Sequence, residues 1–71
     1  MSKPSWDDAT KSAVALAQDA NGKWRWYGDI PEPMEDEWEV PKNLRTGGWL
    51  SSTASRGRPN KSWMRTLELR P

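Results

Sequence analysis

The alternation of apolar and polar residues is clearest at residues 23–27, Lys-Trp-Arg-Trp-Tyr. A period of two predicts a β-strand with both indoles on one face. Just before it, Asn21-Gly22 is typical of a tight turn, in which Gly or Asn adopts a positive φ. Residues 14–19 allow two interpretations, because their alanines favour helix whereas the turn after them favours a hairpin arm. We adopt a hairpin over about residues 14–28.

Both ends of the chain carry helix-start signals. Ser5 is a good N-cap, and Asp8 three residues later forms an imperfect capping box, which predicts a short helix over about residues 5–12. Asn60 is a good N-cap for a final helix over about residues 61–69. Trp63, Met64 and Leu67 are spaced to share one face of that helix.

The middle of the chain predicts further strands separated by loops. Two prolines place residues 30–33 in a loop, and residues 37–40 alternate and read as a strand paired with residues 23–28. A short strand is expected over residues 47–52, followed by a basic loop over residues 54–61. The fold class is therefore α+β: a short N-terminal helix, a small twisted antiparallel sheet of three to four strands and a short C-terminal helix. The whole chain, 1–71, forms one domain, with 1–4 and 54–60 flexible.

Tryptophan must supply much of the core, because the 71 residues include six Trp, no Phe and only eight Val, Ile or Leu. We expect Trp24 and Trp26 to face the core, which leaves Arg25 and Tyr27 exposed together. The alternative makes the two indoles a platform for stacking bases. Without cysteine there is no disulfide, and without histidine a structural zinc site is nearly excluded.

Acidic and basic residues are segregated along the chain, although the net charge is only +1. Residues 29–39 hold six acids and no base, whereas residues 40–71 hold seven bases and one acid. The two runs either screen each other inside the fold or form two patches that steer a charged partner. The candidate partner-binding residues are Arg25, Tyr27, Trp49, Arg56, Arg58, Lys61, Trp63 and Arg65, and the candidate acidic patch is Glu32, Glu35, Asp36 and Glu37.

Several function classes fit the residue types poorly. Without His or Cys the usual nucleophile–base pairs are missing, so we expect no enzyme and no cofactor. The acidic run lacks the spaced pattern of a calcium loop, so we expect a solvated edge and no metal. The N-terminus has no apolar segment of a signal peptide, and no apolar run approaches the roughly 20 residues that span a bilayer. The sequence therefore predicts a soluble protein of the cytoplasm with no membrane partner.

Both ends of the chain carry a recognisable order of residues. The pattern runs from Trp6-Asp7 through Gly22-x-Trp24-x-Trp26-Tyr27 to Asn60-x-x-Trp63 and Leu67-Glu68-x-Arg70-Pro71. This order resembles small tryptophan-rich accessory proteins encoded by tailed bacteriophages, and the resemblance covers about half of the chain. It implies an origin rather than an activity, and it places the protein in the cytoplasm of an infected bacterium.

The expected function is that of a phage accessory protein that binds a host protein and modulates or inhibits it. The alternative is a small single-stranded nucleic-acid-binding protein that uses Trp stacking and the basic loop. A homo-oligomeric assembly protein is a third interpretation.

Overall fold

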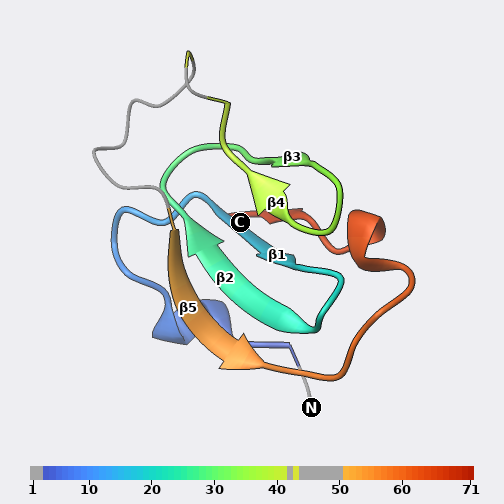
Figure 1. Ribbon diagram of the computed structural model, residues 1–71. Helices are drawn as coiled ribbons and strands as arrows, with labels where there is room; N and C mark the ends of the chain where they lie inside the picture. The colour runs from blue at the N-terminus through green and yellow to red at the C-terminus, as the bar shows by residue number, and fades with distance from the viewer. Residues whose placement is uncertain (1–2, 42, 44–50) are drawn as a thin grey trace.

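The central element is a four-stranded antiparallel sheet in the order β5–β2–β1–β6 (Figure 1). The computed structural model describes residues 3–41, 43 and 51–71. The strands are β1 (Ala15–Gln18), β2 (Lys23–Tyr27), β5 (Ser51–Arg56) and β6 (Glu68–Leu69). The first two strands form the middle of the sheet, and the chain's last strand pairs with the first.

The hairpin predicted over residues 14–28 is confirmed. The Asp19 N–H donates to the Lys23 carbonyl at 2.9 Å, and the Gly22 N–H donates to the Asp19 carbonyl at 2.9 Å. Among the described residues only Gly22 has a positive φ, at 95°. The connection therefore resembles a type I turn closed by a glycine bulge rather than a turn in which Asn21 and Gly22 both take positive φ.

Both predicted helices are wrong, so the α+β class is wrong as well. The described residues contain only two three-residue 3₁₀ turns, η1 (Trp6–Asp8) and η3 (Trp63–Arg65). Ser5 does cap η1, since its Oγ accepts from the Asp7 N–H at 3.1 Å, but the backbone is extended again at Ala9. The C-terminal helix is displaced by β6, whose residues pair with Ala15 and Leu16. At the C-terminal end, sheet pairing outweighs local helix propensity.

A small second sheet crosses one face of the first. Its strands are β3 (Glu32–Pro33) and β4 (Trp38–Glu39), which pair with each other. The loop predicted over residues 30–33 is therefore right for residues 30–31 and wrong for residues 32–33, and the predicted pairing of residues 37–40 with residues 23–28 is wrong. Residues 44–50, which hold most of the strand predicted over 47–52, lie outside the described residues. β5 covers the end of that prediction and extends through residues 54–56, where we predicted a basic loop.

The sheet is covered on both faces, which explains why all four residues of β1 are buried. On one face Leu16, Trp24 and Trp26 pack with Ala13, and Trp6, Ala9 and Ala54 lie against them. The rings of Trp6 and Trp26 are 5.1 Å apart between centroids. Small alanines in β1 let other segments approach closely.

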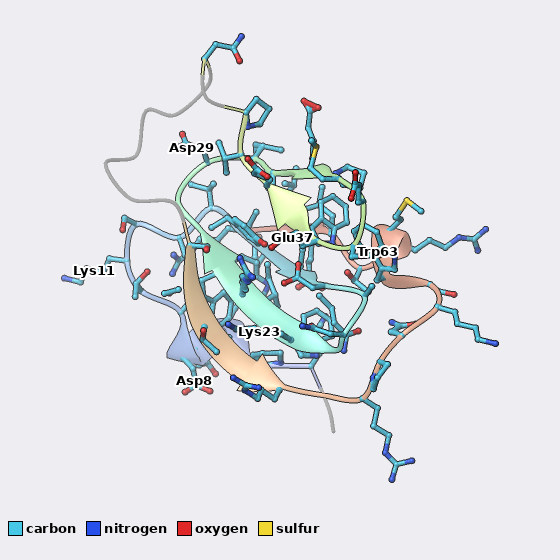
Figure 2. The ribbon with its side chains drawn as sticks, viewed as in Figure 1. Asp8, Lys11, Lys23, Asp29, Glu37 and Trp63 are labelled. Atoms are coloured by element: carbon cyan, nitrogen blue, oxygen red, sulfur yellow. The ribbon has the colours of Figure 1, made fainter. Side chains whose placement is uncertain are left out.

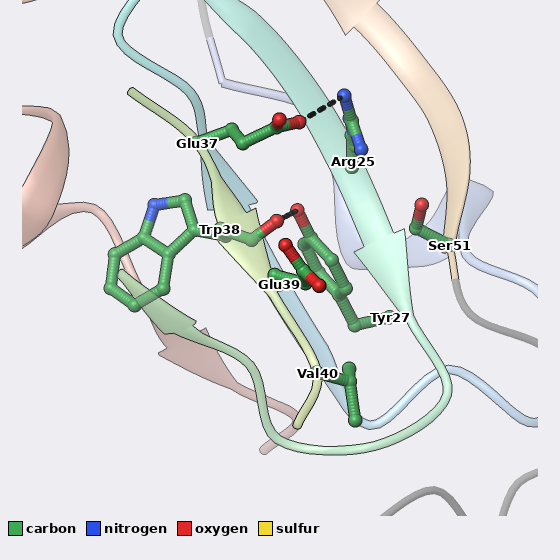
Figure 3. A pocket seen from close by; sticks show the side chains of 7 residues that line it. All are labelled: Arg25, Tyr27, Glu37, Trp38, Glu39, Val40 and Ser51. Carbon is green, nitrogen blue, oxygen red and sulfur yellow. Dashed lines mark hydrogen bonds and ion pairs between the residues drawn. The ribbon is translucent and has the colours of Figure 1, made fainter. Parts of the chain in front are cut away.

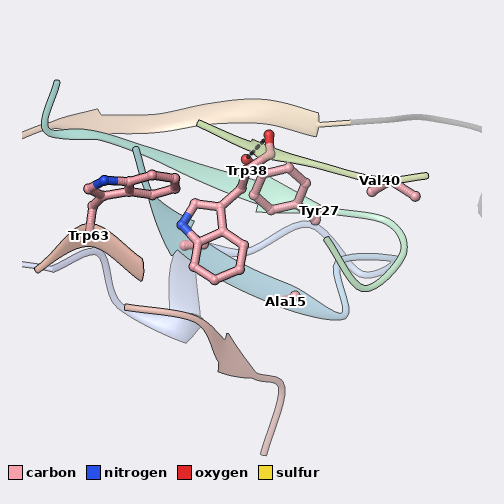
Figure 4. Packing of buried hydrophobic residues seen from close by; sticks show 6 residues of the cluster. Ala15, Tyr27, Trp38, Val40 and Trp63 are labelled. Carbon is pink, nitrogen blue, oxygen red and sulfur yellow. Dashed lines mark hydrogen bonds between the residues drawn. The ribbon is translucent and has the colours of Figure 1, made fainter. Parts of the chain in front are cut away.

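The second face is built around β4 and η3 (Figure 4). It holds Ala15, Ala17, Tyr27, Trp38, Val40 and Trp63. The rings of Trp38 and Trp63 meet edge-on at 5.9 Å and 87°, a favoured aromatic geometry. The core positions predicted for Trp24 and Trp26 are confirmed. The predicted exposure of Tyr27 is wrong, because β4 covers that face and leaves the side chain 2% exposed.

Gly22 generates the first testable prediction, because a Cβ there would lie 2.4 Å from the Gly57 carbonyl oxygen and 2.5 Å from the Arg58 carbonyl. The obstacle is backbone, so Gly22→Asn should fail as badly as Gly22→Val despite the tolerance of Asn for positive φ. We expect either change to lower the free energy of unfolding by about 3 kcal/mol or more. Chemical denaturation measures it.

Asn21→Ala is the matched control, since it removes only the Oδ1 that accepts from the Lys23 N–H at 3.0 Å. That change should cost about 1 kcal/mol. A Gly22→Asn protein as stable as the control would show that the turn does not lie against residues 57–58.

Candidate functional site

The amide side chain of Gln18, at the buried end of β1, fastens the chain that follows β5. Its Nε2 donates to the Gly22 carbonyl at 3.0 Å and lies 3.5 Å from the Arg58 carbonyl. Its Oε1 accepts from Asn60 Nδ2 at 2.9 Å. Gln18 is only 5% exposed, and a buried amide with these partners strongly favours one arrangement of the segments around it.

Backbone bonds hold the same stretch of chain. The Gly57 N–H donates to the Gly22 carbonyl at 2.7 Å, and the Asn60 N–H donates to the Ala20 carbonyl at 3.0 Å. Asn60 Oδ1 then accepts from the Ser62 N–H at 2.8 Å, ahead of η3. The path from β5 to η3 is thus tied to the β1–β2 turn at several points (Figure 1).

We call residues 56–65 the basic segment, because they hold four cationic side chains and no acid. Arg56, Arg58, Lys61 and Arg65 are all exposed. The ion pairs found among the described residues join Lys3 to Glu68 and Arg25 to Asp19 and Glu37, and include none of these four. Arg56 instead lies opposite Lys23 in the β2–β5 register, and like charges in that position are destabilising.

We call residues 32–39 the acidic hairpin, because they hold five acids and no base. Glu32, Glu35, Asp36, Glu37 and Glu39 are all exposed. Figure 2 labels Glu37 in this hairpin and Lys23 on β2. The Asp36 carbonyl accepts from the Ala20 N–H at 3.0 Å, so Ala20 bonds to the acidic hairpin through its N–H and to Asn60 through its carbonyl. In the described part of the chain, no ion pair joins the acidic hairpin to the basic segment.

Among the described residues, Arg25 forms an ion pair with the acidic hairpin. Its Nη2 donates to Glu37 Oε1 at 3.3 Å, and its Nε lies 3.0 Å from Asp19 Oδ2. The second contact is electrostatic rather than a directed hydrogen bond, because that Nε has no hydrogen-bond partner. Arg25 therefore serves the fold, with its charge already committed to two carboxylates.

Asp19 is the most deeply buried carboxylate of the described chain, at 1% exposure. Its Oδ1 accepts from the Trp38 N–H at 3.0 Å, which fixes β4 to the end of β1. Burial raises the pKa of Asp19 above its ordinary value of 3.8, although the Trp38 N–H and the Arg25 charge act in the opposite direction. The carboxylate is a structural acceptor for the second sheet.

The pocket between β2 and β4 offers little chemistry (Figure 3). Its volume is about 190 Å³, and its walls include Arg25, Tyr27 and Glu39. The Tyr27 hydroxyl donates to the Trp38 carbonyl at 3.3 Å, and burial raises its pKa. At neutral pH that hydroxyl stays protonated. Among the residues that the structure describes, no group of three or more acids is arranged to hold a metal ion.

The candidate partner-binding residues separate into three groups. Arg56, Arg58, Lys61 and Arg65 share the exposed basic segment. Arg25 is half-buried in its ion pairs, and Tyr27 and Trp63 are buried in the core. Trp49 lies outside the described residues.

The candidate acidic residues lie together, and two structural residues were not predicted. Glu32, Glu35, Asp36 and Glu37 all lie exposed on the acidic hairpin. Sequence reasoning missed Gln18 and Asp19 as the residues that position both charged segments. Their only signal was a pair of polar residues that directly follows an apolar run.

Comparisons with known proteins give no relative to guide the function: no family model matches, and no curated protein or solved structure shows a significant match. In the described part of the chain, no helix has the length and apolar character needed to cross a membrane.

Asp19 generates a pH prediction. Its folded-state pKa is raised, so its contribution to stability is fully present below about 3.8, the unfolded value, and is lost as pH rises through the folded-state pKa. Asp19→Asn keeps an acceptor for the Trp38 N–H but cannot ionise. The free energy of unfolding of the natural protein, relative to Asp19→Asn, should fall as pH rises from about 3 toward neutrality.

Denaturant titrations of both proteins across that pH range measure the difference in their free energies of unfolding. The contributions of the other carboxylates largely cancel in this difference. A difference that rises with pH would mean that Arg25 outweighs burial at this site.

Proposed function

We propose that this protein is a small accessory protein of a tailed bacteriophage that binds an acidic surface of a host protein through its basic segment. One observation carries the proposal: the fold ties down the backbone of residues 57–60, while the cations around it are exposed and enter none of the ion pairs found among the described residues. A preordered backbone reduces the entropy lost on binding. Arginine is also enriched at protein interfaces.

The internal use of these charges is weak. Glu37 of the acidic hairpin pairs with Arg25. None of the ion pairs among the described residues includes a cation of the basic segment. Lys23 and Arg56 repel each other across β2 and β5. An acidic partner would relieve that repulsion, so the arrangement costs stability in the free protein and favours the bound state.

The nucleic-acid alternative has less support, because the indoles of Trp24, Trp26 and Trp63 are covered, while Trp49 lies outside the described residues. Trp24 and Trp26 are 7% and 4% exposed, and Trp63 is 6% exposed. A base cannot stack on an indole whose faces are covered, and sequence-tolerant binding of single strands depends on such stacking.

The charge reversal of Arg56, Arg58 and Lys61 to Glu is the direct test. All three side chains are exposed, and exposed pairs contribute only about 0–1 kcal/mol, so thermal unfolding should change little. Capture of the host partner by the immobilised protein should fall, chiefly through a slower association rate. Capture is measured from nuclease-treated lysate, and association rates by surface plasmon resonance with the purified partner.

The matched control reverses Glu32, Glu35 and Asp36 to Lys, which alters the acidic hairpin and leaves Glu37 with Arg25. This protein should capture the partner as the natural one does. A basic-segment variant that keeps full capture, or capture that disappears on nuclease treatment, would contradict the proposal. Arg56→Thr separates binding from stability: it should weaken capture yet raise the free energy of unfolding by about 0.2–1 kcal/mol, because the repulsion from Lys23 is removed.

A further inference from the structure

The outer edge of β5 is an open strand edge beside the basic segment. Among the described residues, β5 lies at the end of the strand order and pairs only with β2. Residues 51–55 contain no charge and no proline, which are two of the features that protect an edge, and the β2–β5 register shifts between Trp24 and Arg25. The opposite edge, β6, has only two residues and is followed by Arg70 and Pro71. β5 is therefore the edge that can accept another strand.

The register shows which backbone groups of β5 point outward. Lys23 and Tyr27 both turn their carbonyls toward β1, where they accept from Asp19 and Val14. Backbone direction alternates along a strand, so Arg25, midway between them, also faces β1. Thr53 lies opposite Arg25, and its N–H and C=O therefore point away from β2. Ser51, opposite Tyr27, shares this direction.

The two sides of this edge differ in chemistry. Lys23 and Arg56 form a cationic pair at one end of the β2–β5 ladder. On the face covered by the N-terminal segment, an open groove of about 390 Å³ runs along β5. Trp26, Ala54 and Ser55 line it from the sheet, and Pro4 and Asp8 line it from the other side. Ser55 Oγ is buried there without a hydrogen-bond partner.

We propose that the acidic partner docks as an extended strand added to the outer edge of β5, with alternate carboxylates facing Lys23 and Arg56. This inference rests on the proposed function and specifies its geometry. Strand addition supplies main-chain hydrogen bonds, and alternate side chains supply specificity. A second copy of this chain is a poor occupant of the edge, because β5 has no acid to meet the cations and ends in Arg56 itself.

The test uses Thr53→Pro and Thr53→Ala in the full-length chain. Proline removes an outward N–H, which an edge strand tolerates, whereas alanine keeps it. The probe is a short synthetic peptide in which glutamate alternates with threonine, titrated by NMR. Thr53→Ala should bind the peptide as the natural protein does, and Thr53→Pro about tenfold more weakly or worse. The same peptide with lysine in place of glutamate should not bind.

Amide exchange on the natural protein tests the same hydrogen bond without a substitution, so the inference can be tested even if Thr53→Pro unfolds. Saturating peptide should slow exchange at Thr53. If the peptide shifts the resonances of Arg56 and Arg58 but leaves Thr53 exchange unchanged, strand addition is wrong and the proposed function survives. If no binding occurs and the charge reversal leaves capture intact, the proposed function fails as well. Protection of Thr53 without peptide would mean that a second copy occupies the edge, and that too would overturn the inference.

Discussion

Two adjacent polar side chains at the buried end of β1 hold the segments of this protein together. The Gln18 amide bonds to Gly22 and Asn60, and the Asp19 carboxylate bonds to the Trp38 N–H. The backbone of Gln18 adds bonds to Trp38 Nε1 at 2.9 Å and to the Thr66 hydroxyl. The turn, the second sheet and the basic segment thus all converge here. Buried polar groups are costly when unpaired, so these bonds strongly favour one relative placement of the segments.

The tryptophans fill the core around the segments that Gln18 and Asp19 hold together. With so few aliphatic residues, the chain covers both faces of a very small sheet with indoles, and alanines in β1 leave room for them. This packing also limits function, because the indoles at 24, 26, 38 and 63 are buried and cannot serve as contact surfaces. The described surface presents the charged segments and the edge of β5, together with single exposed apolar side chains such as Met34 and Met64. The charged segments and the strand edge are the features on which the proposed recognition of an acidic polypeptide rests.

Local signals predicted the local features well. Alternation located β2, Asn21-Gly22 located the turn, and Ser5 was a true cap. The N-terminal helix failed because the cap at Ser5 starts only the single turn η1, and the C-terminal helix failed because residues 68–69 pair with β1 instead. The pairing of β4 failed because alternation does not specify a partner. The charge asymmetry indicated the basic segment, but only its bonds to Gln18 and Gly22 revealed how it is held.

Amide exchange on Gln18→Met is the most direct test of the central claim, that one buried amide holds the basic segment in place. Methionine fills a similar volume and leaves the backbone bonds between β1 and β2 in place, so these strands should stay paired. The Gly57 and Asn60 amides should lose protection while those of β2 keep it, and affinity for the acidic partner should fall with them. Unchanged protection at Gly57 and Asn60 in a folded Gln18→Met protein would contradict the claim.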